Sequence, residues 1–324
     1  MRSAARGLRI GCMDELALVD WITRHSRSLG PLVKVGPGDD CAVLAGTGRE
    51  DIHFTIDEVV EGTHFRLAGR GLGPRASGRD VGYKALAAAV SDLAAMGARP
   101  IAAVAAASLR KGMAGTFGRA IHLGLTAAAR DSGCPLVGGN ISETAGPIAV
   151  TVAAIGCAPE GSCFLRSAAR VGDAVFVTGE LGGSILGRHL HPVPRFAESR
   201  RLRELGGVHA MMDVSDGLAL DLWRLARASR VGAAIDAARV PVSPDARRLA
   251  RLTGKSALEH ALSDGEDYEL LFTASSAAAE RIERLWDLPT RLSRLGEIVP
   301  RSKGLLIREG ARLRRLEPAG YRHL

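Results

Sequence analysis

DVGYKALAAAVSDLAAMGA, residues 80–98, is the stretch that decides the fold. It is rich in alanine and leucine and contains no proline, so it predicts a helix. Asp92 lies among Leu86, Val90 and Leu93, at the margin of the apolar stripe, where a carboxylate needs a partner. Lys84 is two turns away, which is far for a direct ion pair. An ion pair with Lys84 and a cation bound by Asp92 remain the two interpretations.

Outward from this helix, the first half of the chain alternates between short β-like runs and helices. The runs HFTID, PIAAVAAASL, PLVG and PIAVTVAAIG predict strands over residues 53–57, 100–109, 135–138 and 147–156. Further helices are predicted over residues 115–132 and 13–25, the latter with Leu16, Val19 and Ile22 at helical spacing. Because the preceding residues lack an apolar signal region, Met13 is expected to be the natural start.

The segment RVGDAVFVTGELGGS, residues 170–184, predicts a strand, a glycine turn and a helix, and so the opening of a second domain. A length of 324 residues also favours two domains, which we expect at 13–156 and 157–324. The order of the later elements is mixed, which favours an α+β fold over repeated βαβ winding. The later predictions are helices at 216–229, near 243–263 and at 277–287, strands at 232–236 and 268–273, and two late short strands.

Composition excludes several classes of protein. Hydrophobic residues make up 46% and charged residues 24%, as in soluble globular proteins, and the longest apolar run, Ile101–Ala107, is too short to cross a membrane. The net charge of +8 comes mainly from arginines on predicted helix faces, which indicates a solvated surface, with attraction of anionic small molecules as the alternative, rather than a nucleic-acid partner. Five cysteines without a CxxC pair are typical of a reducing cytoplasm.

Carboxylates come from five separated segments, more than a packed core tolerates unpaired. These are GPGDD (36–40), TIDEVVEGTHF (55–65), SDLAAMGA (91–98), DVSDG (213–217) and LSDGEDYELLFT (262–273). Mg²⁺ prefers such oxygen ligands, and the candidates are Asp40, Asp57, Asp92, Asp213 and Asp216.

Structural interpretations of two segments remain open at this stage: a plain turn at GPGDD, and helix capping by Ser215 or Asp216. The glycine turn TGELGGS could present backbone amides to a phosphate, but such turns are common. The P-loop, HExxH and GxSxG motifs are all missing from the sequence.

In order and spacing, these motifs resemble those of the thiamine-monophosphate kinases. This family belongs to the superfamily of aminoimidazole ribonucleotide synthetase, selenophosphate synthetase and hydrogenase maturation factor E. The resemblance runs from Leu16 to Tyr321 and rests on GDDCAVL, TIDEVVEGTHF, VGYKALAAAVSDLAAMGARP, GGN, VTGELGGS, HPVPR, DVSDGLALDL and LSDGEDYELLFT. It implies a two-domain α+β fold like that of aminoimidazole ribonucleotide synthetase. In that fold an N-terminal mixed sheet forms a barrel across a homodimer and is followed by a C-terminal α/β domain.

The resemblance also implies direct transfer of the γ-phosphoryl group of ATP to thiamine monophosphate, with Mg²⁺ and without a phosphoenzyme. The metal positions, which include the catalytic aspartates, would be Asp40, Thr55, Asp57, Asp92, Asp213 and Asp216. The nucleotide positions would be Thr55, Gly139, Asn140, Arg166 and Ser215. The positions contacting the thiamine moiety would be His64, Glu266 and Tyr321.

This chemistry needs no dedicated base, because a phosphate monoester with a second pKa of about 6 is already largely dianionic at neutral pH. Positioning and charge neutralisation are what it requires. The chain departs from the family pattern at Asn140, where aspartate is usual, and at Ile56, where threonine is usual. Two alternatives therefore stay open: a related ATP-dependent transferase with another acceptor, and a catalytically weak nucleotide-binding homologue.

Overall fold

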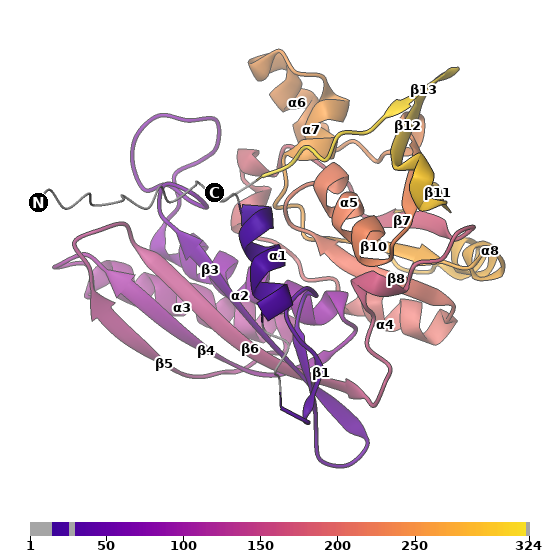
Figure 1. Cartoon of the computed structure of the whole chain (residues 1–324). Coiled ribbons are helices and arrows are strands. Elements are labelled where there is room, and N and C mark those ends of the chain that lie inside the picture. The colour runs from indigo at the N-terminus through magenta and orange to yellow at the C-terminus, as the bar shows by residue number, and fades with distance from the viewer. Residues whose placement is uncertain (1–14, 26–29, 322–324) are drawn as a thin grey trace, which may run out of the picture.

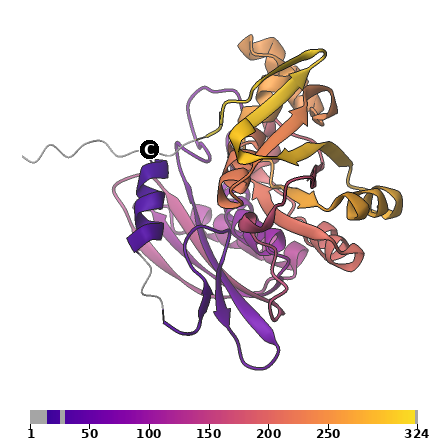
Figure 2. The ribbon, with the colours of Figure 1, turned by 45° about the vertical axis from the view of Figure 1, so that its right-hand side comes forward.

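The computed structural model describes residues 15–25 and 30–321, which form two mixed β-sheets lying side by side with their helices (Figures 1 and 2). The first sheet has the strand order β1-β2-β3-β6-β4-β5, and only the β4–β5 pair is parallel. Its strands are β1 (Val33–Val35), β2 (Ala42–Ala45), β3 (Glu50–Val60), β4 (Arg99–Leu109), β5 (Leu136–Glu143) and β6 (Ala149–Pro159).

The second sheet has the strand order β13-β12-β9-β11-β7-β10-β8, and only the β12–β9 pair is parallel. Its strands are β7 (Ala174–Thr178), β8 (Val208–Val214), β9 (Gly232–Asp236), β10 (Glu269–Ala274), β11 (Leu292–Val299), β12 (Leu305–Glu309) and β13 (Arg312–Arg315). The helices of the described residues are α1 (Glu15–His25), α2 (Gly78–Ala95), α3 (Thr116–Ser132), α4 (Phe196–Leu205), α5 (Leu218–Ala228), α6 (Pro244–Thr253), α7 (Ala257–Ser263) and α8 (Ser276–Leu285).

Helices α2 and α3 pack together on one face of the first sheet, and α2 begins at a capping box formed by Ser77 and Asp80. The two helices approach closely where they cross, because glycines occupy the crossing. A Cβ added at Gly82 would lie 2.0 Å from the carbonyl oxygen of Ile121, and one at Gly124 would lie 2.0 Å from that of Arg79. Helix α2 also contacts β8 of the second sheet, so it belongs to both halves of the molecule.

Helices cover both faces of the second sheet. Since successive residues of a strand point to opposite faces, each strand contributes side chains to both cores. Val175 and Val177 of β7 share a core with α5 and α7. Ala174 and Phe176 share the other core with α4 and α8, and Phe176 stacks on Phe272 with ring centroids 5.1 Å apart. The C-terminal half is therefore a three-layer unit, as expected for an α/β domain.

The face of the first sheet opposite α2 and α3 remains open in the single chain. Phe54 and Ile56 of β3 and Val104 of β4 point to this side and are 45%, 64% and 44% exposed. Exposed apolar side chains gathered on one sheet face are typical of a surface that another molecule covers.

The α+β fold and most elements agree with the sequence-based predictions, although β3 and β5 extend beyond the predicted strands and β1, β2 and β8 were not predicted. Three strands, β11, β12 and β13, follow α8, where only two short strands were predicted. The prediction of an α-helix after the glycine turn TGELGGS is wrong. Only 3₁₀ turns follow, at Ser184–Leu186 and Arg188–Leu190. Gly183 and Gly187 have φ values of +71° and +143°, which an α-helix does not accommodate.

Strand β6 runs to Pro159, so the expected boundary between residues 156 and 157 lies inside this strand. We propose that the division falls a few residues later, between β6 and β7. Met13 and the start of its predicted helix lie outside the described residues, and α1 is described from Glu15. Among the described residues, none of the helices has the length and apolar character needed to span a membrane.

Candidate active site

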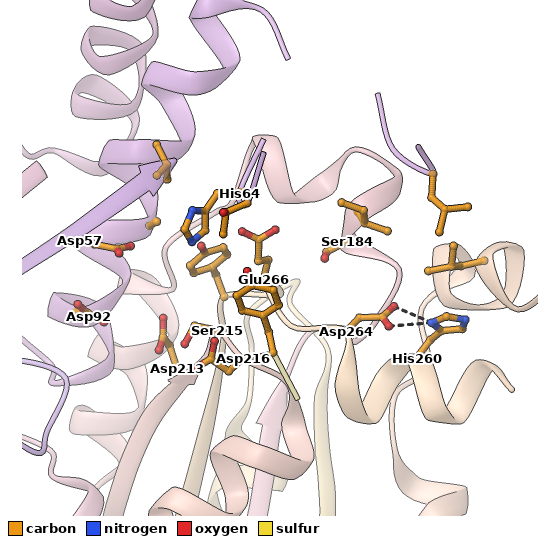
Figure 3. A pocket seen from close by; sticks show the side chains of 18 of the residues that line it. Asp57, His64, Asp92, Ser184, Asp213, Ser215, Asp216, His260, Asp264 and Glu266 are labelled. Atoms are coloured by element: carbon orange, nitrogen blue, oxygen red, sulfur yellow. Dashed lines mark hydrogen bonds and ion pairs between the residues drawn. The ribbon is translucent and has the colours of Figure 1, made fainter. Parts of the chain in front are cut away.

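A cavity of about 500 Å³ lies between the two halves of the molecule. Residues from all five acidic segments except the first line it (Figure 3). The predicted site residues in its wall are Asp57, His64, Asp92, Asp213, Ser215, Asp216, Glu266 and Tyr321. Tertiary structure thus brings together side chains from β3, α2, the end of β8 and the segment before β10.

Three carboxylates form the centre of this site. Ligand oxygens of Asp40, Asp92 and Asp213 lie within 4.8 Å of one another, although these residues precede β2, lie on α2 and end β8. The hydroxyl of Thr55 donates to Asp92 at 2.5 Å, and that of Ser91 donates to Asp213 at 2.6 Å. Each hydroxyl orients a carboxylate without neutralising it.

The electrostatics of this cluster favour a bound cation. Burial, followed by the charges of Asp213 and Asp40, raises the pKa of Asp92 well above its ordinary value. Burial and Asp40 raise the pKa of Asp213 to about 8. One buried oxygen of Asp40, Oδ2, has no hydrogen-bond partner among the described residues. Carboxylate oxygens of like charge, buried and partly unpaired, fit the ligand set of a hard divalent cation such as Mg²⁺.

Lys84 does not pair with Asp92, so the ion-pair interpretation of that aspartate is wrong. The Lys84 ammonium group, which is fully buried, instead contacts a carboxylate oxygen of Glu266 and donates to the carbonyl oxygen of His64 at 2.6 Å. Asp92 is therefore left to the carboxylate cluster.

Arg166 holds the first acidic segment. Its guanidinium group contacts Asp40, and its backbone N–H donates to the carboxylate of Asp39 at 3.2 Å. Burial, and then the charge of Asp40, raises the pKa of Asp39 to about 7. GPGDD is thus more than a plain turn, since it carries two carboxylates against one arginine.

The capping interpretation of Ser215 and Asp216 is also wrong. Asp221, one turn into α5, accepts the backbone N–H groups of Asp216 and Gly217 at 3.0 and 3.1 Å. Arg224 bridges the carboxylates of Asp216 and Asp221. Because Asp221 satisfies the amides at this helix start, the side chains of Ser215 and Asp216 line the cavity.

His64, Glu266 and Tyr321 line another part of the cavity wall (Figure 3 labels the first two). The backbone N–H of Val60 donates to Nδ1 of His64 at 3.0 Å, so the neutral imidazole carries its proton on Nε2. Glu266 adopts φ +53°, and its N–H donates to the carbonyl oxygen of Ser215 at 2.6 Å. Tyr321 is tied to the same segment through an N–H bond of 2.9 Å to the carbonyl oxygen of Asp216.

Gly139 and Asn140 do not join this constellation in the single chain. They lie on the exposed edge strand β5, where they line a different cavity, between β4 and α3. Gly139 is level with Asp57 across the sheet but separated from it by β6 and β4, three strand spacings or about 14 Å away. The strand register places Asn140 and Ile56 on the open face of the sheet. It places Thr55 and Asp57 on the opposite face, towards α2.

Sequence reasoning missed several polar side chains of the site. Lys84 was considered only as a partner for Asp92, and Ser91, Asp221 and Arg224 were not considered. A fully buried lysine is rare, and the apolar surroundings of Lys84 in residues 80–98 are a signal that could have drawn attention to it.

Comparison with known proteins defines the class first. The AIR synthase related protein N-terminal domain family matches residues 38–158, and the corresponding C-terminal domain family matches residues 176–308. The chain is 37% identical to a thiamine-monophosphate kinase of Rhodopirellula baltica, with 95% of this chain and 97% of the relative covered. It is 32% identical to that of Bacillus subtilis, with 96% and 99% covered. The chain belongs to the thiamine-monophosphate kinase family of AIR synthase related proteins.

Solved structures agree with this assignment. The structure described as "AaThiL complexed with AMPPCP and TMP" has a TM-score of 0.83 and 28% identity, and covers 99% of this chain and 100% of its own. A thiamine-monophosphate kinase from Stenotrophomonas maltophilia K279a has a TM-score of 0.69 and 32% identity, with 90% and 96% covered. Escherichia coli HypE, at 22% identity and a TM-score of 0.69, shares the fold.

Proposed function

We propose that this protein phosphorylates thiamine monophosphate to thiamine diphosphate with ATP as the phosphoryl donor. The observation that carries the proposal is one cavity that joins a carboxylate cluster to the family's thiamine-contact positions. Support comes from the relatives' assigned activity and from the structural neighbour, which holds an ATP analogue and TMP.

Mg²⁺ is the proposed metal. Asp40, Asp92 and Asp213 would hold it, with Asp57 and Asp216 in the nearby cavity wall. When bound, Mg²⁺ would neutralise the phosphates and hold the attacking and leaving oxygens in line. Thr55 and Ser91 orient the carboxylates by hydrogen bonds, so the donor set is preorganised.

The acceptor needs no base from the protein, because its phosphate is already largely a dianion at neutral pH. The protein's contribution is to bind and orient the acceptor. His64 presents Nε2–H as a donor, and Glu266 offers a carboxylate to the cationic, amine-bearing thiamine moiety. We assign Ser215 and Arg166 to nucleotide binding. Ser215 lies in the wall of the same cavity, and Arg166 contacts Asp40 in the Asp39–Asp40 turn.

The active protein is a homodimer in this proposal. It acts in the cytoplasm. The apolar open face of the first sheet supports pairing with a second copy, as in the barrel expected for this fold. Gly139 and Asn140, remote from the cavity within one chain, belong to the nucleotide site only if the dimer or a closure of the sheet brings them near it.

The test is chromatographic detection of thiamine diphosphate after incubation with ATP, Mg²⁺ and thiamine monophosphate. Product at turnover amounts, dependent on Mg²⁺, is expected. ATP hydrolysis without thiamine diphosphate would favour another acceptor. Nucleotide binding without any turnover would favour the non-catalytic alternative and implicate Asn140 and Ile56, the two departures from the family pattern.

A further inference from the structure

We infer that Lys84 is a positioning residue that fixes the acceptor-binding side chains His64 and Glu266 relative to each other, and so sets affinity for thiamine monophosphate. This inference rests on the proposed function. Lys84 does not contact the carboxylate cluster, and its side chain is fully buried from solvent.

The first step of the argument is the position of the ammonium group between two elements. Lys84 comes from α2, and its Nζ donates to the backbone carbonyl of His64, which follows β3. The same Nζ contacts the carboxylate of Glu266, which lies before β10 in the other half of the molecule. One cation therefore connects the two halves at the point where the cavity opens between them.

The second step is energetic. Lys84 has 0% side-chain exposure, and burial lowers its pKa while the charge of Glu266 opposes that shift. Burial likewise raises the pKa of Glu266. Removing one partner of a buried ion pair leaves the other unpaired in a low-dielectric site, which is strongly unfavourable. Without Lys84, Glu266 would therefore take up a proton or move toward water.

The third step is that the segment carrying Glu266 is fixed along its length by two arginines and by neutral hydrogen-bond donors, all from residues distant in the sequence. Asp267 accepts two bonds from the N–H of Gly182, at 3.0 and 2.9 Å, and one from Arg188 at 2.6 Å. Glu269 accepts from Arg195 at 2.7 Å and from Thr178 at 2.7 Å.

Glu266 and Tyr268 both adopt φ +53°, a left-handed conformation that L side chains rarely adopt. Such a conformation persists when surrounding contacts over-determine it. Lys84 is the contact that fixes the side chain of Glu266, while the two arginines fix its neighbours.

The spacing on α2 fits a division of labour. Lys84, Ala88 and Asp92 all lie on the side of α2 towards the site, with Ala88 and Asp92 in the cavity wall. Eight residues of helix separate Lys84 from Asp92, about 12 Å. Asp92 belongs to the phosphate end of the site, and Lys84 supports the acceptor end, so a change at Lys84 should alter acceptor binding and spare nucleotide binding.

The experiment compares Lys84→Met, Glu266→Gln and the double variant with the wild type. We expect Lys84→Met to raise KM for thiamine monophosphate by about tenfold or more, as for loss of a charged hydrogen bond, with the dissociation constant of Mg·ADP unchanged within about twofold. Because Lys84 acts in part through Glu266, the loss in the double variant should be smaller than the product of the two single losses. Lys34→Met, which breaks a lysine–aspartate pair of 2.6 Å outside the cavity, is the matched control and should keep the wild-type KM.

The inference is overturned if KM for the acceptor is unchanged, if the effects of the two changes multiply, or if Mg·ADP binding weakens equally. Should Lys84→Met fail to fold, the double variant leaves no buried charge unpaired, and its KM relative to Glu266→Gln decides. If the wild type makes no thiamine diphosphate, the proposed function fails, and calorimetric titration of thiamine monophosphate into the AMPPCP–Mg²⁺ complex tests Lys84 separately. A wild type that does not bind this acceptor at all would overturn both.

Discussion

At the scale of single residues, the site is defined by negative charge that the fold concentrates and that Arg166 neutralises only in part. Asp40, Asp92 and Asp213 come within 4.8 Å of one another, and their hydrogen bonds come from hydroxyl groups and one arginine. Such an arrangement destabilises the folded chain unless a cation binds. Stability and activity should therefore respond in opposite directions when one carboxylate is removed.

Asp92→Asn is expected to lower turnover by about 100-fold or more, since it removes a proposed metal ligand from the proposed phosphate end of the site. The melting temperature of the metal-free protein should stay the same or rise, because a repelling charge is lost. Steady-state kinetics with thermal melts checks both. Asp131→Asn, at an exposed aspartate paired with Arg130, is the control and should change neither. Wild-type activity in Asp92→Asn would refute the metal assignment.

The pH dependence of stability follows from Asp213. Burial raises its pKa from 3.8 to about 8 in the folded chain, so the folded form holds more protons than the unfolded form between these values. The free energy of unfolding of the metal-free protein should therefore fall as the pH rises through that window. Mg²⁺ competes with these protons and should stabilise more at about pH 8 than at about pH 5. Melting curves with and without Mg²⁺ test this, and an equal Mg²⁺ effect at both pH values would contradict it.

At the scale of elements, α2 organises the molecule. It packs on the first sheet, contacts β8 of the second, and carries Lys84 and Asp92 towards the cavity. Its distance from α3 is set by glycines at the crossing, where the backbones are in close contact. Function should thus be sensitive to small changes at this crossing, although the crossing itself contains none of the proposed site residues.

Gly82→Ala tests the crossing. In an exposed helix this change would stabilise by about 1 kcal/mol, but here the added methyl would lie 2.0 Å from the carbonyl oxygen of Ile121. We expect a net destabilisation of about 1–3 kcal/mol, as for overpacking, and reduced activity as α2 moves. Urea unfolding measures the first effect.

Gly118→Ala on α3 is the comparison for Gly82→Ala. Its Cβ would meet mainly the flexible side chain of Leu109, at 3.1 Å, so the cost should be smaller. Equal stability of the two variants would show that the close crossing does not matter.

At the scale of the whole molecule, the first sheet is covered on one face only. Phe54, Ile56 and Val104 are exposed on the other face, and the edge strand β5 is exposed along most of its length. Pairing with a second copy would cover this surface, as the family resemblance implies.

Val104→Asp is expected to weaken the dimer, because a charge on a covered apolar face costs free energy on association. Sedimentation equilibrium should show a shift towards monomer. Leu252→Asp, at a side chain that is 64% exposed on α6, is the matched control and should sediment as the wild type. A wild-type protein that is monomeric, or a Val104→Asp variant that remains fully dimeric, would refute the proposed interface.

The sequence by itself determined the main elements and most of the acidic residues that line the cavity. Periodicity predicted α2, α3 and most strands, and the acidic segments predicted Asp57, Asp92, Asp213 and Asp216, which line one cavity. These features could be predicted because local propensity and residue chemistry are properties of short segments. The order of motifs gave the family, which the comparisons confirm.

Only the tertiary structure decided which charges meet. Lys84 pairs with Glu266, 182 residues away, and not with Asp92 eight residues along the same helix. Asp221, rather than Ser215 or Asp216, satisfies the start of α5. Asn140 lies on an edge strand remote from the aspartates that the family pattern groups it with. Sequence spacing could not decide these points, because long-range contacts depend on how elements pack and cross, and that packing is fixed only when the two halves fold against each other.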